Sequence, residues 1–252
     1  MISVSILGVG NVGSHLLNAF RSNPAVKLVQ LYSRTPASDP TDSLPWCNDL
    51  QALKPADLYI LTVPDDQIRE MSAKLPFSNR LIAHTSGSVA IDELDFKNRR
   101  AVFYPLQSFN REAEVNMAEV PICIETEDKK DLGLLRDLAN LISEKVVVMD
   151  SQKRLKLHLA AVIVNNFTNH LFHIAREQLQ EQDIDFELLK PLINKTVDKL
   201  DRLTPAQAQT GPARRGDRST IKKHLELVLD SDHRAMYELM TDLILKAHGK
   251  KL

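Results

Sequence analysis

Three glycines near the start of the chain, Gly8, Gly10 and Gly13, stand at the spacing G-x-G-x-x-G. A β-compatible run precedes them and a helical pattern follows directly, which is the setting of a dinucleotide-binding turn. In such a turn Gly8 makes the tight bend, Gly10 lets the backbone approach a pyrophosphate, and Gly13 lets the helix pack closely on the sheet. The helix start, with Asn11 and Val12, adds free N–H groups and the positive end of a dipole. The sequence therefore predicts a dinucleotide site, with an ordinary strand–helix turn as the alternative.

The residues after the second predicted strand, 26–32, bear on which dinucleotide is bound. An NAD site usually has an acidic side chain roughly 20 residues past the glycines, where it holds the ribose 2′-hydroxyl. This chain has Ser33-Arg34-Thr35 at that place. The hydroxyl of Ser33 and the guanidinium of Arg34 can both bind a 2′-phosphate. We therefore predict NADP as the cofactor, with a plain polar turn as the alternative.

Further candidates follow the predicted strand 57–63, because ligands of open parallel sheets bind beyond the carboxyl ends of the strands. Thr62, Val63 and Pro64 stand at this end and are expected to line the nicotinamide ribose. Asp65 comes next, and an N-cap of the following helix is the favoured interpretation of its carboxylate. These residues extend the predicted cofactor site beyond the glycine turn.

A second group follows the short predicted strand 80–84, in the stretch His84-Thr85-Ser86-Gly87. His84 and Ser86 are candidate site residues, because ligands of open parallel sheets bind beyond the carboxyl ends of the strands. Each of them could equally be a turn or cap residue. The site interpretation and the turn interpretation therefore stay open for both.

Polar residues interrupt an apolar helical pattern after residue 150. His158, Asn165 and Asn169 stand at i, i+7 and i+11, which is one face of an α-helix, and Asn166 lies beside them. Polar groups among apolar neighbours cost free energy unless they are hydrogen-bonded. These side chains are therefore expected either to be paired within a core or to point into a cleft.

The stretch 210–220 combines turn-forming glycines with two arginines, Arg214 and Arg215. Gly-Pro and Gly-Asp set tight turns, and Asp217 can cap the helix that follows. A solvated loop and an anion-recognising loop are both compatible with this pattern.

The elements around these residues predict an α/β fold with two domains. Over the first 150 residues strands alternate with helices, which is typical of a Rossmann doubly wound parallel sheet. A proline- and serine-bearing connection, 36–45, leads to a short strand near Trp46. After Asp150 the pattern is helical throughout. We expect a Rossmann domain over 1–150 and an all-helical domain over 151–252, with helices at 151–182, 186–203, 218–229 and 231–247.

Composition and charge narrow the classes of function. The 252 residues carry a formal net charge of −1 and 5% aromatic residues, so nothing favours nucleic acid or an anionic membrane as a partner. No apolar run approaches the ~20 residues of a membrane span. Cys47 and Cys123 stand far apart without metal-type spacing, so no metal site is predicted and a reducing, cytoplasmic location is expected.

Taken together, these motifs resemble a known group of proteins. The chain resembles the bacterial Rossmann-like proteins with a C-terminal domain of unknown function, which are often labelled provisionally as NADP oxidoreductases. They belong to the superfamily of 6-phosphogluconate dehydrogenase and pyrroline-5-carboxylate reductase. The resemblance rests on the glycine and Ser33-Arg34-Thr35 motifs and on the stretches 56–65, 84–87, 104–109, 160–167 and 211–220.

The resemblance also implies roles for individual residues. In the related hydroxyacid dehydrogenases a serine or threonine like Ser86 contacts substrate, and an asparagine like Asn165 or Asn166 helps to bind it. Their catalytic lysine would fall near Ala161 or Val162, and no lysine is there. His158 could exchange a proton in its place. The resemblance further implies a homodimer formed through the helical domain.

These features together predict an NADP(H)-dependent oxidoreductase that transfers hydride to or from a small polar carbonyl, hydroxy or imine substrate in an interdomain cleft. Ser86, His158 and Asn165 would surround the reacting carbon. A different class remains open, namely a nucleotide-binding sensor or scaffold that kept the fold without turnover, which the missing lysine favours. A deazaflavin-dependent reductase shares the fold, and Arg34 argues against it.

Overall fold

The computed structural model describes residues 1–34 and 44–249. Thr35 and residues 36–43 of the expected connection lie outside these ranges. The chain divides into two compact units, Met1–Asn165 and Asn166 onward, so the expected boundary near residue 150 falls inside the first unit. Helix α4 (Ser151–Ala161) belongs to the first unit because its Leu157 packs beside Tyr104 and Cys123 of the sheet.

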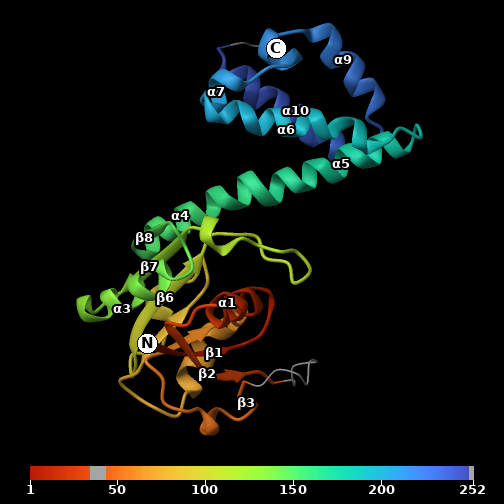
Figure 1. Ribbon diagram of the computed structural model, residues 1–252. Coiled ribbons are helices and arrows are strands. Elements are labelled where there is room, and N and C mark those ends of the chain that lie inside the picture. Colours follow the sequence, from red (N-terminus) through yellow and green to blue (C-terminus); the bar gives the residue numbers. More distant parts are fainter. Residues whose placement is uncertain (35–43, 250–252) are drawn as a thin grey trace. The chain divides into compact units, whose positions relative to one another are not determined.

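The first unit is built on a twisted sheet flanked by helices (Figure 1). Among the described residues this sheet has eight strands, in the order β3-β2-β1-β4-β5-β6-β7-β8. The strands are β1 (Ile2–Leu7), β2 (Val26–Tyr32), β3 (Trp46–Cys47), β4 (Leu58–Leu61), β5 (Leu81–His84), β6 (Arg99–Pro105), β7 (Ile122–Thr126) and β8 (Val146–Val148).

The expectation of a wholly parallel sheet needs one correction, because β7 runs antiparallel to β6. The other neighbouring strands pair in parallel. A parallel pair needs a crossover, usually a helix, to carry the chain back across the sheet. Among its described residues, the connection between β6 and β7 contains only a short 3₁₀ turn at Met117–Glu119. Without a crossover helix the chain turns back, and β7 runs beside β6 in the opposite direction.

Alternating side chains place apolar groups on both faces of this sheet. In β4, Leu58 and Ile60 pack on one face with α1 (Asn11–Arg21) and α3 (Lys129–Asn140). Tyr59 and Leu61 pack on the other face with Ile68 of α2 (Ile68–Lys74). A strand covered on both faces reads as a continuous apolar run, which is what 58–61 shows. The carboxyl ends of the strands are thereby held in a rigid frame.

The helical region has shorter elements than the periodicity predicted. The expected helix 151–182 is α4, a π-helical segment (Val162–Phe167) and α5 (Thr168–Gln180). The expected helix 186–203 is α6 (Lys190–Asp198) between two 3₁₀ turns. The expected break at 204–216 contains the short helices α7 (Pro205–Ala208) and α8 (Pro212–Arg215), followed by α9 (Arg218–Leu227) and α10 (Ser231–Ala247). Within the described ranges no helix is both long and apolar enough to cross a bilayer.

Candidate active site

A cavity of about 500 Å³ opens at the carboxyl ends of β1, β2 and β4 in the first unit. Its wall brings together the predicted cofactor residues Gly8, Gly10, Ser33, Arg34, Thr62, Val63 and Pro64. Asn11, Val12 and Gly13 are not in the wall, because they form the first turn of α1 beneath it. Residues from three separate stretches of sequence therefore meet at one edge of the sheet.

The glycine turn is packed so tightly that two of its glycines tolerate no side chain. Gly8 has a φ of +108°, and a Cβ there would lie 2.7 Å from the carbonyl oxygen of Thr62. A Cβ on Gly13 would lie 2.4 Å from the carbonyl oxygen of Gly8. The Thr62 hydroxyl donates to that same oxygen at 2.6 Å, which ties β4 to the turn. At Gly10, in contrast, a Cβ would meet no atom within 4 Å, so the backbone there faces open space.

The start of α1 suits an anion. Gly10 is its N-cap residue and offers no side chain to the free N–H groups, and the first turn holds no acidic residue. The first four N–H groups of a helix have no partner within the helix, and its dipole favours negative charge at this end. The cavity, the open backbone at Gly10 and the uncapped helix together fit the pyrophosphate of a dinucleotide.

Helix α2 and its N-cap residue Gln67 supply part of the cavity wall that the sequence analysis missed. Gln67, Glu70, Met71 and Lys74 line the cavity together with Ser33 and Arg34. These positions follow the pattern i, i+3, i+4 and i+7, so they form one helical face. That periodicity was visible in the sequence, but only the order of the strands shows that this face meets the end of β2.

A second group of residues lies at the end of β6, two strands along the same edge from β4. The hydroxyl of Tyr104 lies 3.1 Å from Nδ1 of His158 on α4, with the two rings edge to face. Tyr104 is buried and His158 is half-buried. A Cβ on Gly87 would lie 2.6 Å from Nδ1 of His158 and 2.7 Å from Cζ of Tyr104. Any side chain at position 87 would therefore clash with these two rings. We call this pair the Tyr104–His158 dyad.

The electrostatics of the dyad favour a neutral tyrosine. Burial raises the pKa of the Tyr104 hydroxyl to about 12, so it keeps its proton at neutral pH. A hydroxyl can donate to a bare Nδ1 or accept from a protonated one. Nε2 of His158 has no hydrogen-bond partner among the described residues, so one nitrogen is held while the other can bind a ligand. Tyr104 carried no sign of this role in the sequence beyond its place at the end of a strand.

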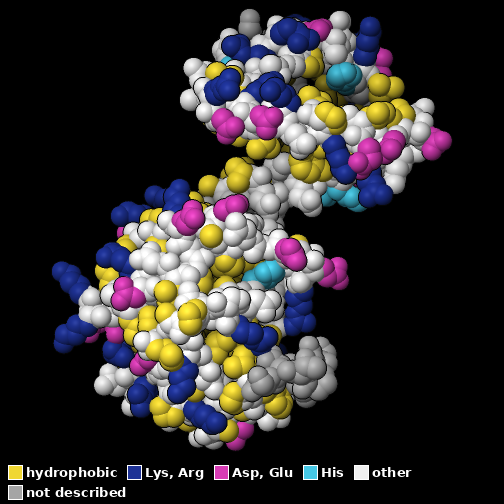
Figure 2. All heavy atoms as spheres, viewed as in Figure 1, with side chains coloured by type: hydrophobic (Ala, Val, Ile, Leu, Met, Phe, Trp, Pro, Cys, Tyr) yellow, Lys and Arg dark blue, Asp and Glu magenta, His cyan; other side chains and the backbone are white. Residues whose placement is uncertain are grey.

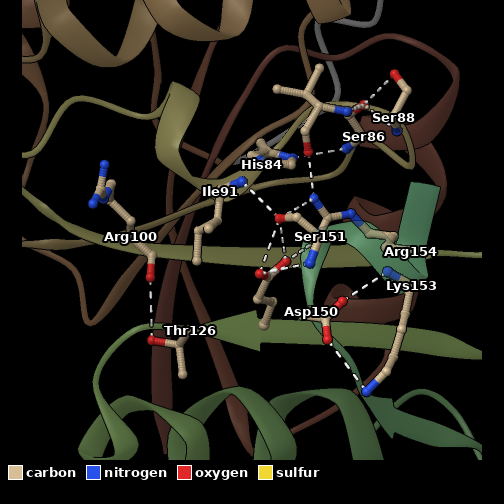
Figure 3. A network of polar contacts seen from close by, with 12 residues as sticks. His84, Ser86, Ser88, Ile91, Arg100, Thr126, Asp150, Ser151, Lys153 and Arg154 are labelled. Atoms are coloured by element: carbon tan, nitrogen blue, oxygen red, sulfur yellow. Dashed lines mark hydrogen bonds and ion pairs between the residues drawn. The ribbon is translucent and has the colours of Figure 1, made fainter.

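Ser86, predicted as a catalytic residue, lies in a tight turn beside the dyad. Its hydroxyl accepts from the backbone N–H groups of Ser88 and Val89 at 3.1 and 3.0 Å (Figure 3). The Ser88 hydroxyl in turn donates to Asp65 at 2.6 Å. Asp65 therefore does not cap the helix after β4 as expected, and its carboxylate instead joins the turn after β5 to the turn after β4.

His84, the other candidate in this stretch, is fully buried at the end of β5. Its Nδ1 accepts from the N–H of Ser86 at 3.2 Å. Burial, and then the positive charge of Arg154, lower the pKa of His84 to about 3. The ring is therefore neutral at physiological pH and acts as a hydrogen-bond acceptor that shapes the turn.

A buried ion pair fixes the first turn of α4 on the sheet (Figure 3). Arg154, 1% exposed, pairs with Glu125 of β7 and donates to the carbonyl oxygen of Val89. The Ser151 hydroxyl contacts the same carboxylate at 2.8 Å and accepts from the N–H of Ile91 at 3.0 Å. These contacts join α4, β7 and the chain that follows the Ser86 turn. His158 stands one helical turn after Arg154, so the ion pair helps to position the dyad.

The remaining predicted residues of the helical region are exposed. Asn165, Asn166 and Asn169 face solvent and are not part of a core. Asn165 and Asn166 lie in the π-helical segment, whose i→i+5 winding differs from that of an α-helix. The sequence analysis placed these asparagines on one helical face with His158 by assuming an uninterrupted α-helix. The π-helical segment breaks that spacing, so the shared face is not formed as expected.

The stretch 210–220 lies in the second unit. Asp217 caps α9 by accepting from the N–H of Thr220, as predicted. Gly211 and Gly216 both have positive φ, and Arg214 and Arg215 are exposed. The structure thus confirms the turns and the cap, and leaves the anion-binding interpretation as a prediction.

Arg111 is a further cation beside the glycine turn. It lies in the connection between β6 and β7 and donates to the carbonyl oxygen of Val9. The neighbouring Asn110 carbonyl lies 2.8 Å from Nε2 of His15 on α1. This connection is thereby attached to the turn that carries Gly8 and Gly10.

Within residues 1–34 and 44–249, no group of three or more His, Cys, Asp or Glu side chains could hold a metal ion.

Comparison with known proteins agrees with this geometry. Residues 120–244 match a family described as a domain of unknown function, DUF2520. A provisionally assigned NADP oxidoreductase from Bacteroides fragilis is 33% identical, with a TM-score of 0.87 over 99% of this chain and 98% of that one. A search of curated proteins finds no match.

More distant structures share the fold. A pyrroline carboxylate reductase from Plasmodium falciparum, solved with NADP bound, is 14% identical with a TM-score of 0.60, over 98% of this chain and 97% of that one. An imine reductase from Streptomyces aurantiacus is 12% identical with a TM-score of 0.67, over 97% and 93%. The structural relatives are thus NAD(P)-binding oxidoreductases. The identity to the Bacteroides fragilis protein over the full length shows that this chain belongs to the family of Rossmann-fold, NADP oxidoreductase-like proteins with a C-terminal DUF2520 domain.

Proposed function

We propose that this protein is an NADP(H)-dependent oxidoreductase that acts on a small polar carbonyl, hydroxy or imine compound. One observation carries the proposal. The cavity with the glycine turn and Arg34 lies at the ends of β1, β2 and β4, and the Tyr104–His158 dyad lies at the end of β6 on the same edge of the sheet. A dinucleotide site and a proton-exchanging pair on one edge are the two parts that such chemistry needs.

The cofactor roles follow from the cavity wall. The backbone at Gly10 and the start of α1 would hold the pyrophosphate, and Ser33 with Arg34 would bind the 2′-phosphate. Thr62, Val63 and Pro64 would contact the nicotinamide ribose, on the side nearest β5 and β6. When bound, reduced NADP supplies a hydride.

The dyad would supply the proton. In the protonated ring, Nδ1 donates to the Tyr104 oxygen and Nε2 faces the substrate. The Nε2 proton moves to the carbonyl oxygen or imine nitrogen as the adjacent carbon is reduced, and Tyr104 keeps the ring in place throughout. Ser86 would shape the turn that brings Gly87 against the dyad, and the exposed Asn165 would offer an amide to a polar substrate group.

The first experiment measures binding of NADPH and NADH by calorimetry. We expect NADPH to bind more tightly, and Arg34→Ala to weaken NADPH about tenfold while leaving NADH nearly unchanged. Equal losses for the two cofactors would contradict the role of Arg34. Binding of neither cofactor to the wild-type protein would refute the proposal.

The second experiment follows NADPH oxidation with a panel of imines and carbonyl compounds. His158→Gln and Gly87→Ala should each lower turnover about 10- to 100-fold without changing NADPH affinity, because both disturb the dyad and leave the cavity intact. Tyr104→Phe should have a smaller effect, since the ring remains but loses its hydrogen bond. Normal turnover in His158→Gln would show that this histidine is structural.

A nucleotide-binding sensor is the second candidate, and one observation favours it. Ala161 and Val162 stand where the resembling dehydrogenases have a catalytic lysine. Tight NADPH binding without turnover on any member of the panel would support the sensor and reject the enzyme.

We also propose that the second unit forms a homodimer. Leu188, Leu192 and Val197 are 71%, 62% and 63% exposed, and apolar side chains lie on its visible surface in Figure 2. Exposed apolar side chains of this kind are typical of a protein interface, and a second copy is the commonest partner. Leu192→Asp should shift the mass measured by light scattering to that of a monomer, whereas the control Asn194→Asp on the same helix should not. A monomeric wild-type protein would refute the dimer.

A further inference from the structure

One wall of the cofactor cavity carries an ion pair that the proposed function does not use. Glu70 and Lys74, one turn apart on α2, form a contact between Oε1 and Nζ. Both side chains line the cavity together with Ser33 and Arg34. They are 66% and 61% exposed, so the pair is solvated and each side chain is free to move. Exposed ion pairs of this kind contribute little to stability. Stability therefore does not explain why the Glu70–Lys74 pair stands in the cavity wall.

Two positive charges that line the same cavity act on the carboxylate of Glu70. The hydrogen bond and charge of Lys74, followed by the charge of Arg34, lower the pKa of Glu70. Arg34 comes from the turn after β2 and Lys74 from the end of α2, so two elements place cations around one anion. In this arrangement the Glu70 carboxylate supplies the negative charge that the two cations of the described cavity wall attract.

We propose that Lys74 is a ligand of the 2′-phosphate of NADP and that Glu70 is an internal counter-anion which this phosphate displaces. The inference rests on the proposed function, because it assigns residues to the same cofactor site. A 2′-phosphate carries more charge than a carboxylate and has three acceptor oxygens, so it can bind Arg34 and Lys74 together. NAD lacks this phosphate and leaves the Glu70–Lys74 pair intact. Helix α2, as well as the turn after β2, thereby selects between the two cofactors.

The charge balance of the cavity supports this assignment. Arg34 and Lys74 are opposed by Glu70 alone among the charged residues that line the described cavity. Breaking an exposed pair is inexpensive, so a phosphate that binds both cations replaces a weak contact with stronger ones. Glu70 then faces the phosphate as a like charge. The assignment therefore predicts opposite effects for the two residues, which a purely structural helix pair would not show.

The test measures binding of 2′,5′-ADP and of 5′-ADP to the full-length protein by calorimetry. We expect Lys74→Gln to weaken 2′,5′-ADP about tenfold and to change 5′-ADP by less than about twofold. Glu70→Gln should strengthen 2′,5′-ADP and not 5′-ADP, because it removes the competing anion. Lys222→Gln is the matched control, since Lys222 and Glu226 form another exposed pair one turn apart, on α9, outside this cavity.

The outcomes separate this inference from the function on which it rests. If the wild-type protein binds 2′,5′-ADP selectively and Arg34→Ala abolishes that preference while Lys74→Gln does not, the inference is wrong and the proposed cofactor site stands. An equal loss of both nucleotides in Lys74→Gln would also overturn it, since that result indicates damage to α2. If the wild-type protein binds neither nucleotide, both proposals fail.

Discussion

The two units of this protein differ in how they use apolar residues. In the first unit the sheet buries side chains on both faces, and residues such as Leu58, Ile60 and Phe103 are fully inaccessible. In the described part of the second unit the buried apolar residues are Ile174, Ala213, Ile221 and Leu245, while many leucines are exposed. Apolar burial is the main favourable contribution to folding. The first unit therefore contains its own core, whereas the described part of the second leaves much of its apolar surface exposed.

The same contrast holds for polar groups. In the first unit Arg154, His84 and Ser86 are buried and form hydrogen bonds between distant segments. In the second unit several charged side chains form exposed pairs within one helix, such as Lys246 with Asp242. Buried networks position groups, whereas exposed helical pairs add little. A rigid site is accordingly expected in the first unit.

The largest expected effect is on the buried ion pair. Arg154→Met leaves the Glu125 carboxylate without its partner, and breaking a buried pair in this way costs about 3–5 kcal/mol. The free energy of unfolding from urea denaturation should fall by that amount. The exposed counterpart Lys246→Met should change it by less than about 0.5 kcal/mol. Similar losses in the two variants would remove the difference drawn between the units.

A pair of leucine truncations compares the packing directly. Leu58→Ala removes a fully buried side chain from the sheet and should cost about 2–5 kcal/mol. Leu192→Ala changes a side chain that is 62% exposed and should cost less than about 0.5 kcal/mol in a monomer. A larger loss that depends on protein concentration would instead sharpen the contrast, because it would mean that Leu192 is buried in a dimer.

The buried histidine should make the first unit sensitive to acid. His84 has a folded-state pKa of about 3, whereas in the unfolded chain its pKa is ordinary, near 6.5. Between these values the unfolded state binds the extra proton, so stability falls as the pH drops below about 6.5. This contribution amounts to ~2 kcal/mol at pH 5.

The variant His84→Asn keeps an acceptor for the N–H of Ser86 and cannot take up that proton. Its free energy of unfolding should therefore lose less between pH 7.5 and pH 5 than that of the wild-type protein, even if its absolute stability is lower. Identical pH dependence in the two proteins would contradict a neutral, buried His84.

Several features of the fold could be predicted because they depend on neighbours in sequence. The glycine spacing at 8–13 requires a tight turn before a helix, and the structure has that turn with Gly8 at positive φ. The apolar run 58–61 requires a strand covered on both faces, which it is. The cap at Asp217 follows from its residue type and position. Local sterics, periodicity and capping act over a few residues, so the sequence alone contains them.

Other features depend on which distant segments meet, and these required the tertiary structure. Tyr104 and His158 are 54 residues apart, and only the packing of α4 beside β6 and Gly87 makes them a pair. Glu70 and Lys74 join Arg34 because β4 neighbours β1, which neighbours β2. Asp65 bonds to Ser88 where local rules favoured a cap. Contacts over such separations depend on the strand order and on the burial of the whole sheet. No single stretch of the sequence determines either of these.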